Sequence, residues 1–325
     1  MLILGIETSC DETAASVVKN GREILSNVVS SSLKYHKKFG GVIPEIATRH
    51  HVENIDKVVN CSLYNAGVGT GDIDSVAVTE GPGLVGALVC GNSFAKAMAY
   101  SLDVPLVTVD HLKAHVYSAM MRKDAPRFPF IGLVVSGGHT RLYLVKGYDK
   151  FIVLGDTLDD AIGEAYDKVA KILGLEYPGG PIIDRIAKKG SRSIRFTCRP
   201  IKGSLDFSFS GVKTAVLYHV KGEGCPSTSL GTGRVKGEIS NIAASFQESA
   251  LKVIVNNTLK AMEQHNLKTL VIGGGVSANS RFREMLAREA MFRGLKIFFP
   301  PLELCSDNAA MVAGLAYRLQ GEGKC

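Results

Sequence analysis

The sequence lacks three features that would place it in a familiar class of proteins. No Cys-x-x-Cys pair occurs among its seven widely spaced cysteines, which argues against a disulfide framework or a thiolate zinc cluster and favours a reducing compartment. No apolar run approaches the length of a membrane span, and the start, MLILGIETSCDET, has neither a basic n-region nor a signal h-region, so we expect a cytoplasmic protein without membrane contact. No G-x-x-x-x-G-K-[ST] motif occurs, which excludes a P-loop enzyme.

Length and charge give weaker indications. A chain of 325 residues has room for about two domains and a large buried core. The net charge of +7 favours a polyanionic partner such as nucleic acid. Many basic proteins bind nothing acidic, so charge alone does not identify the partner.

Two segments of similar design indicate an internally duplicated fold. Residues 2–18 and 130–145 each read as a strand, a tight turn of small polar residues and a second strand. Further strands are predicted at 74–79, 105–109 and 269–274, and helices at 84–102, 159–173, 241–264 and 280–293. This alternation predicts two α/β lobes with a cleft between them. Residues 222–238, rich in Gly, Ser and Thr, are expected to form a surface loop.

The sharpest chemical signal is the sequence DHLKAH, which follows the predicted strand at 105–109. If these residues form a helix, His111 and His115 lie on one face about 5–6 Å apart at Cβ, so both imidazoles can reach one metal ion. Such a pair also arises by chance, but its place after the end of a strand is where open α/β sheets bind ligands. A carboxylate would complete a site suited to Fe(II) or zinc.

Three acids are candidates for the third ligand: Glu80, Asp110 and Asp307. Asp307 stands in SDNAAMVAGLAYRL, which has the pattern of a capped helix start, and a helix N-terminus faces anions favourably. An ordinary N-cap residue explains Asp307 more simply. From the residues alone we prefer the N-cap interpretation.

Glycine turns at 81–86 and 273–279 each lie between a predicted strand and helix, where backbone N–H groups can bind a phosphate. The first matches the dinucleotide pattern G-x-G-x-x-G, but Pro82 removes an amide donor from it. A tight turn is therefore the preferred interpretation of both. The hairpin turns at 8–13 and 136–140 could wrap a phosphoryl group or be ordinary β-turns.

Two charged patterns remain ambiguous. Asp160, Glu164 and Asp167 share one face of the predicted helix at 159–173, which usually means a solvated face. Residues 34–51 interleave Lys, His and Arg with Tyr and Phe, a composition suited to contacts with RNA phosphates and unpaired bases. A second basic cluster comprises Lys188, Lys189, Arg192, Arg195 and Arg199. A solvated surface explains either basic cluster equally well.

A set of characteristic stretches occurs in order between residue 2 and about residue 318: LGIETSCDET, FGGVIPEIATRHH, GPGLVGAL, DHLKAH, SGGHT, YPGGP, FSFSGVKTAV, GGGVSANSRFRE and SDNAAM. Through these stretches nearly the whole chain resembles the TsaD family, in its bacterial and mitochondrial branch. The family is similar in fold to actin, the Hsp70 ATPase domain and sugar kinases. We accordingly expect a first lobe at 1–129, with a helix at 307–325 packed back on it, and a second lobe at 130–306.

The resemblance implies an activity and a set of site residues. The activity is transfer of the threonylcarbamoyl group from threonylcarbamoyl-adenylate to N6 of the adenosine 3′ of the anticodon, in tRNAs that read codons beginning with A. The implied metal ligands are His111, His115 and Asp307, so the resemblance overrides the N-cap interpretation. The residues expected to contact substrate are Val134, Val135, Ser136, Gly137, Gly138, Asp167, Gly180, Asp184 and Asn279.

The reaction also needs proton transfer and a completed metal site. Asp11, Glu12 and His139 lie in turns suited to proton transfer or substrate orientation, without a base being assigned among them. Archaeal and eukaryotic relatives carry a metal-liganding tyrosine where this chain has Ser136, so we expect water or substrate in that coordination position. The expected cofactors are one divalent metal, Fe(2+) before Zn(2+), and an adenine nucleotide in the cleft.

The implied partners are tRNA, a TsaB-like paralogue and a TsaE-like ATPase. Three other functions compete with this interpretation: a metalloprotease, an ATPase of the same fold and a non-catalytic scaffold. Proteases of the H-E-x-x-H type need a glutamate after the first histidine, whereas here Leu112 follows His111. An ATPase does not require the histidine pair, and a scaffold would not need to retain it.

Overall fold

The computed structural model describes residues 1–198, 201–222 and 235–322, and the chain divides into two compact units. Unit 1 comprises Met1–Phe128, Lys146–Phe151 and Phe299–Cys325, and unit 2 comprises Pro129–Val145 and Ile152–Phe298. Arg199 and residues 223–234 of the predicted surface loop lie outside the described residues. Unit 1 is therefore assembled from both ends of the chain.

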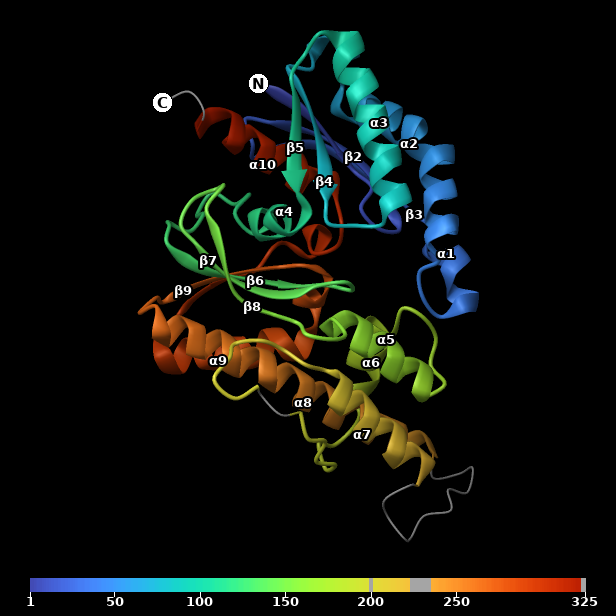
Figure 1. Ribbon diagram of the computed structural model, residues 1–325, viewed down its shortest axis with the longest axis vertical. Helices are drawn as coiled ribbons and strands as arrows, with labels where there is room; N and C mark the ends of the chain where they lie inside the picture. Colours follow the sequence, from blue (N-terminus) through green and yellow to red (C-terminus); the bar gives the residue numbers. More distant parts are fainter. Residues whose placement is uncertain (199–200, 223–234, 323–325) are drawn as a thin grey trace. The chain divides into compact units, whose positions relative to one another are not determined.

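The sheet of unit 1 contains five strands in the order β3-β2-β1-β4-β5 (Figure 1). These are β1 (Leu2–Glu7), β2 (Glu12–Lys19), β3 (Glu23–Ser31), β4 (Ser75–Gly81) and β5 (Leu106–Asp110). β1 pairs antiparallel with β2 and parallel with β4, and β4 pairs parallel with β5. The predicted first hairpin is confirmed, and the strands that follow it are parallel.

The sheet of unit 2 repeats this succession in the order β8-β7-β6-β9-β10. Its strands are β6 (Phe130–Val135), β7 (Thr140–Val145), β8 (Phe151–Asp156), β9 (Thr269–Gly273) and β10 (Lys296–Phe298). β6 pairs antiparallel with β7 and parallel with β9, and β9 pairs parallel with β10. The predicted internal duplication is therefore confirmed by strand order and direction in both sheets.

Helices cover the two sheets. Unit 1 has α1 (Leu33–His36), α2 (Pro44–Ala66), α3 (Val85–Leu102), α4 (His111–Ser118) and α10 (Ala309–Glu322). Unit 2 has α5 (Ile162–Ile172), α6 (Gly179–Ala187), α7 (Ser210–Lys221), α8 (Val235–Gln264) and α9 (Ser280–Arg293). Short 3-10 turns are η1 (Lys37–Phe39), η2 (Thr70–Asp72), η3 (Gly275–Ala278) and η4 (Leu302–Leu304). Within the described ranges, no helix is long and apolar enough to cross a membrane.

Two predicted boundaries are wrong. The helix predicted from residue 159 begins only at Ile162, so Asp160 precedes it. There its carboxylate pairs with Lys168 of α5 and with Lys213, at 2.5 and 2.7 Å, and Lys168 also pairs with Glu164 at 2.8 Å. α8 begins at Val235, inside the predicted loop at 222–238.

The two faces of β1 pack against different helices. Leu4 and Ile6 belong to a core cluster with α2 and α3, which includes Ile55 and Ala95. Side chains alternate between the faces of a strand, so Gly5 points to the opposite face, where α10 lies. A Cβ on Gly5 would stand 2.4 Å from the Ala309 carbonyl oxygen. Only glycine permits this close contact of strand and helix.

This contact predicts a large effect of one methyl group. Gly5→Ala should lower the free energy of unfolding by about 1–3 kcal/mol, because the added Cβ overlaps backbone that is fixed at the start of α10. Urea denaturation followed by circular dichroism measures the change. Gly71→Ala is the matched control, since nothing lies within 4 Å of the Cβ that it would gain. Equal stability of the two variants would contradict the packing argument.

Candidate metal centre

His111 and His115 are presented by the short helix α4, directly after β5. Asp110 caps this helix, because its Oδ1 accepts a hydrogen bond of 2.9 Å from the Lys113 backbone N–H. The two histidines are four residues apart and share one face, with ring centroids 4.5 Å apart. Both side chains are buried. The sequence prediction of a histidine pair on one helix face agrees with this geometry.

Asp307 brings a carboxylate to the pair from the segment just before α10. Its Oδ1 lies 3.1 Å from His115 Nε2 and 3.7 Å from His111 Nε2. The three donor atoms lie within 4.8 Å of one another, a spacing that permits binding of a shared cation. Two imidazoles and one carboxylate are ligands typical of Fe(II) and zinc sites that keep open positions.

The other candidate acids have different roles. Asp110 caps α4, and Glu80 is exposed. The N-cap interpretation of Asp307 does not hold, because the neighbouring Asn308 accepts the hydrogen bond of the Met311 backbone N–H, at 3.0 Å, and so caps α10. The carboxylate of Asp307 is thereby left to face the imidazoles.

Glu7 is a functional residue that the sequence reasoning missed. It is fully buried at the end of β1, and its Oε2 lies 3.1 Å from His111 Nδ1. It also accepts hydrogen bonds from the Ser9 backbone N–H and from Thr79 Oγ1, both at 2.5 Å. The carboxylate assigns a proton to Nδ1 and orients Nε2 towards Asp307, the arrangement that carboxylates give to metal-binding histidines.

In the Glu7–His111 pair, each group favours the charged form of the other. Burial raises the pKa of Glu7, but the attraction of the His111 ring outweighs it, so the pKa lies below its usual value. For His111, burial lowers the pKa, while the charges of Glu7 and Asp307 raise it to about 9. The net negative surroundings of the imidazoles therefore favour a cation.

The surroundings of His115 indicate whether these residues are suited to bind a metal ion. Its Nδ1 and Nε2 are both buried, and within the described parts of the chain neither makes a well-aligned hydrogen bond, although Nε2 lies 3.1 Å from Asp307 Oδ1. A buried imidazole without hydrogen bonds carries a desolvation penalty unless something else binds it. A metal ion between His111, His115 and Asp307 would satisfy Nε2, so the donor set fits a divalent metal.

The turn at residues 8–13 adjoins this centre in unit 1. Burial, then the charges of Asp11 and Asp307, raise the pKa of Glu12 well above its usual value. Glu12, one of the predicted catalytic residues, is thus electrostatically coupled to Asp307 and to its neighbour Asp11. His139, the third, belongs to unit 2.

In unit 2, the predicted substrate turn closes the hairpin of β6 and β7. The Ser136 backbone N–H donates to the His139 carbonyl oxygen at 2.8 Å, and the His139 N–H donates to Ser136 Oγ at 3.1 Å. Val134 and Val135 are buried strand residues before the turn. Open space surrounds the Cβ positions of Gly137 and Gly138, so a ligand can approach this backbone.

The remaining predicted substrate residues lie around the N-termini of α6 and α9. Asp167 accepts a hydrogen bond from the Gly179 backbone N–H at 2.7 Å, and open space surrounds the Cβ position of Gly180. Asp184 binds Ser280 through both the hydroxyl and the backbone N–H, at 2.9 and 3.2 Å. Asn279 caps α9 and donates to Gln247 Oε1 at 2.9 Å. These side chains already join the helices of unit 2.

The glycine turn at 81–86 serves packing rather than phosphate binding. A Cβ on Gly83 would stand 2.5 Å from the Ser9 carbonyl oxygen, and the Leu84 N–H donates to that oxygen at 2.7 Å. A Cβ on Gly86 would stand 2.4 Å from Thr48 Oγ1. Gly83 thus lets the start of α3 approach the turn at 8–13, and Gly86 lets α3 approach α2, which supports the preferred interpretation of a tight turn.

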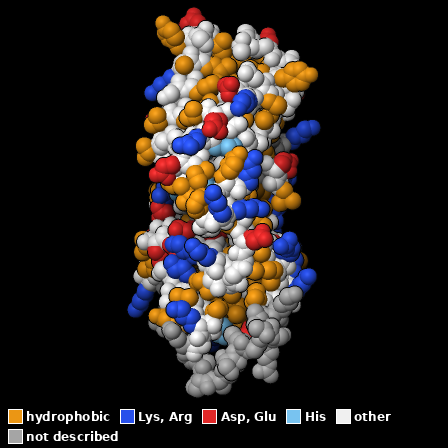
Figure 2. Space-filling model, turned by 90° about the vertical axis from the view of Figure 1, so that its right-hand side faces the viewer, with side chains coloured by type: hydrophobic (Ala, Val, Ile, Leu, Met, Phe, Trp, Pro, Cys, Tyr) orange, Lys and Arg blue, Asp and Glu red, His pale blue; other side chains and the backbone are white. Residues whose placement is uncertain are grey.

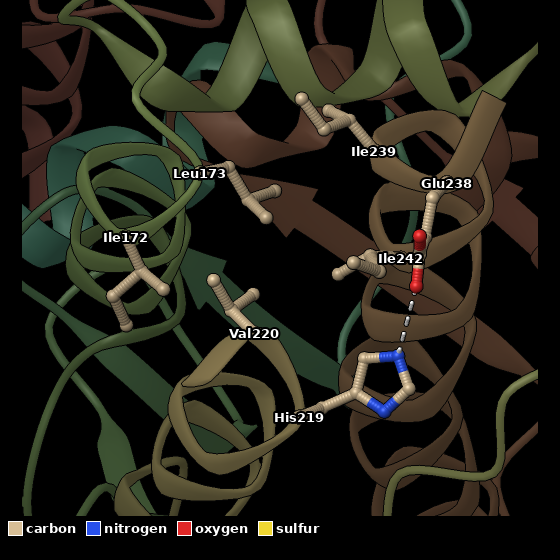
Figure 3. A pocket seen from close by; sticks show the side chains of 7 residues that line it. All are labelled: Ile172, Leu173, His219, Val220, Glu238, Ile239 and Ile242. Carbon is tan, nitrogen blue, oxygen red and sulfur yellow. Dashed lines mark ion pairs between the residues drawn. The ribbon is translucent and has the colours of Figure 1, made fainter. Parts of the chain in front are cut away.

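A pocket in unit 2 is lined by none of the predicted site residues (Figure 3). The side chains that line it come from the ends of α5 and α7 and the start of α8: Ile172, Leu173, His219, Val220, Glu238, Ile239 and Ile242. His219 Nε2 and Glu238 Oε1 lie 4.0 Å apart at its edge. The mainly apolar lining offers no set of metal ligands.

Solved structures with low sequence identity share the fold. Component A of the (R)-2-hydroxyglutaryl-CoA dehydratase of Acidaminococcus fermentans matches with a TM-score of 0.59 and 16% identity, over 99% of each chain. Full-length HypF in its phosphate- and nucleotide-bound form matches with a TM-score of 0.63 and 13% identity, over 100% of this chain and 47% of HypF. The predicted fold class, shared with actin, Hsp70 and sugar kinases, is confirmed.

Closer relatives share the sequence over nearly its whole length. Residues 23–314 match the family described as TsaD: tRNA N6-adenosine threonylcarbamoyltransferase. A protein of that name from Syntrophus aciditrophicus is 48% identical over 324 residues, which cover 100% of this chain and 94% of the relative. Another from Bacillus subtilis is 49% identical over 318 residues, 96% of this chain and 89% of the relative. The chain belongs to the TsaD family of tRNA N6-adenosine threonylcarbamoyltransferases.

Proposed function

We propose that this protein transfers a threonylcarbamoyl group from threonylcarbamoyl-adenylate to N6 of the adenosine 3′ of the anticodon, in tRNAs that read codons beginning with A. Membership of the TsaD family supports a transferase that acts on tRNA. The observation that carries the chemical part of the proposal is the convergence of His111, His115 and Asp307, with Glu7 behind His111. We expect the reaction to take place in the cytoplasm.

The three converging residues would hold one divalent metal. We expect Fe(2+), with Zn(2+) as the alternative, because two imidazoles and a carboxylate suit both ions. When bound, the metal would supply Lewis-acid polarisation and a fixed point for substrate oxygens. We expect water or substrate at the remaining coordination positions.

In the proposed reaction one bond forms and two bonds break. The N6 amine forms a bond to the carbamoyl carbon, the bond from that carbon to the adenylate oxygen breaks, and the amine loses a proton. The open backbone at Gly137, Gly138 and Gly180 supports binding of the adenylate or a related adenine nucleotide, since exposed N–H groups bind phosphate. Asp11, Glu12 and His139 are proposed to orient substrate or to accept that proton.

The rest of the proposed substrate contacts hold these turns in place. Val134 and Val135 form the buried strand that leads into the hairpin turn. Asp167 fixes the start of α6, while Asp184 and Asn279 fix the start of α9. We propose that their remaining polar atoms contact substrate from this framework.

A metalloprotease is the less favoured function. Hydrolysis by a histidine pair of this type needs a general base next to the first histidine, and here that position is Leu112, which is fully buried. An ATPase of the same fold is the other rival, and the histidine–aspartate centre has no part in that reaction. ATP turnover without a modified tRNA product would favour the ATPase.

We also propose that the protein works with a TsaB-like paralogue and a TsaE-like ATPase. α2 and α3 pack side by side and expose several large apolar side chains, which would supply a contact surface for the paralogue. These residues are Val52, Tyr64, Val85, Val89 and Tyr100. Apolar and basic side chains are interspersed on the side of unit 1 that faces the viewer in Figure 2.

Removal of one metal ligand should abolish transfer. We expect His111→Ala to lose bound metal and to lower formation of N6-threonylcarbamoyladenosine by more than about 100-fold, since loss of a ligand exceeds the effect of losing its supporting hydrogen bond. Elemental analysis of anaerobically purified protein and nucleoside analysis of tRNA, with the partner proteins added, measure both. His265→Ala is the matched control, because His265 is exposed and remote in sequence from the centre. Full activity of a metal-free His111→Ala protein would refute the proposal.

Glu7 gives a more selective test. Glu7→Gln keeps an acceptor for Nδ1 but removes the charge, so metal affinity should fall about 10- to 100-fold while the protein stays folded. Competition between the protein and a chelator measures this affinity. Glu23→Gln changes an exposed acid on β3 and should leave the affinity unchanged. If both variants bind metal like the unmodified protein, Glu7 does not support the centre.

A further inference from the structure

The segment that follows β3 and includes the first residues of α2 carries positive charge that the protein itself does not neutralise. Residues 33–49 contain the cations Lys34, Lys37, Lys38 and Arg49, and Glu45 as the acid of the segment. All four cations are exposed, and none forms an ion pair with another described residue. By contrast, Lys168 and Arg281 elsewhere in the chain are paired with carboxylates.

Two aromatic rings accompany these cations. Lys34 Nζ lies 4.8 Å from the ring centroid of Tyr35, and Lys38 Nζ lies 4.9 Å from that of Phe39. Both rings are 45% exposed, a large fraction for aromatic side chains. A cation beside an exposed ring occurs twice, four residues apart. Proteins bind unpaired nucleotides with such pairs, the cation contacting phosphate and the ring stacking on a base.

Buried histidines tie this segment to the turn beside the metal centre. His36 is fully buried, and its Nδ1 accepts a hydrogen bond from the Ile43 N–H at 3.2 Å, so Nε2 carries the proton. Nε2 then donates to Ser32 Oγ at 2.8 Å, and Ser32 Oγ donates to the Asp11 carbonyl oxygen at 2.8 Å. Burial lowers the pKa of His36, which keeps the ring neutral in this chain of bonds.

His51 makes a second connection to the same turn. Its Nε2 lies 3.0 Å from the Cys10 carbonyl oxygen, and its Nδ1 lies 2.8 Å from Thr13 Oγ1. These histidines, which the sequence offered as parts of a basic patch, are therefore structural. They fix the segment with Lys34, Tyr35, Lys38 and Phe39 to residues 10–13, next to Asp307.

We infer that residues 33–49 form a binding surface for unpaired nucleotides of the tRNA beside the adenosine that is modified. This inference rests on the proposed function, which places the target base in a single-stranded loop. Lys34, Lys37 and Lys38 contact phosphates, and Tyr35 and Phe39 stack on bases. An acidic surface of a partner protein is the competing occupant, but it gives no reason for two exposed rings next to the cations.

Salt dependence of tRNA binding tests the role of the lysines. The triple variant K34A/K37A/K38A should flatten the plot of log binding constant against log salt by about 0.7 for each phosphate that a lysine no longer neutralises, roughly 2 in total. Fluorescence anisotropy with labelled anticodon stem-loop RNA and the full chain measures the slope. The matched control K252A/K260A/K268A removes three exposed lysines of α8 and the turn after it and should keep the slope unchanged.

The aromatic rings are tested separately. Tyr35→Ala and Phe39→Ala should each weaken binding of the stem-loop about 5- to 150-fold at fixed salt, with an unchanged salt slope, since each removes a stacking ring but no charge. A fully paired RNA duplex of equal length should be bound equally by the variants and the unmodified protein. Unchanged stem-loop affinity in both ring variants would contradict stacking.

Metal content separates this inference from the proposed function. The triple lysine variant should retain its metal and show a raised KM for tRNA, whereas His111→Ala should bind tRNA normally and form no product. If the unmodified protein forms product and the triple variant binds tRNA with the same affinity and salt slope, the inference is wrong and the function stands. If the triple variant binds tRNA normally but fails to associate with its partner proteins, the surface contacts protein instead.

Discussion

The contact between β1 and α10 at Gly5 brings together the residues of the candidate metal centre in unit 1. Because Gly5 has no side chain, the start of α10 lies directly against the strand, and Asp307 stands just before that helix. Glu7 follows two positions along β1, on the same face as Gly5. One face of one strand therefore positions Asp307 through packing and His111 through a hydrogen bond.

The Glu7–His111 pair is better explained by orientation of a ligand than by stability. Bringing two charges out of water carries a desolvation penalty that their attraction only partly offsets. Here Ser9 and Thr79 provide the additional hydrogen bonds that a buried carboxylate needs. The result is an imidazole with a fixed tautomer and a fixed direction, properties that an apolar pair of the same volume would lack.

The sequence was sufficient for features that depend on local pattern. The two hairpins, the strand and helix alternation and the histidine pair all follow from spacing along short segments, and the structure contains them. Asp307 could not be decided in this way, because Asp307 and Asn308 are both good N-cap residues and only the three-dimensional structure shows that Asn308 caps α10. The resemblance to TsaD, rather than spacing, pointed to Asp307, the acid that lies beside the two imidazoles.

Long-range partners account for what the residues alone did not reveal. Glu7 looks like an isolated acid at the end of an apolar strand, and its partners Thr79 and His111 lie 72 and 104 positions away. His36 and His51 read as surface cations until their hydrogen bonds to Ser32, Cys10 and Thr13 are known. Asp160 was placed on a helix that starts two residues later, and its partners Lys168 and Lys213 lie 8 and 53 positions away.

The assembly of unit 1 from both ends of the chain has a consequence for biosynthesis. A ribosome releases His111 and His115 long before Asp307, because the whole of unit 2 is encoded between them. During that interval β1 has no α10 to cover its second face, and the nascent protein holds two imidazoles without their carboxylate. The candidate set of metal ligands is therefore complete only when translation is almost finished.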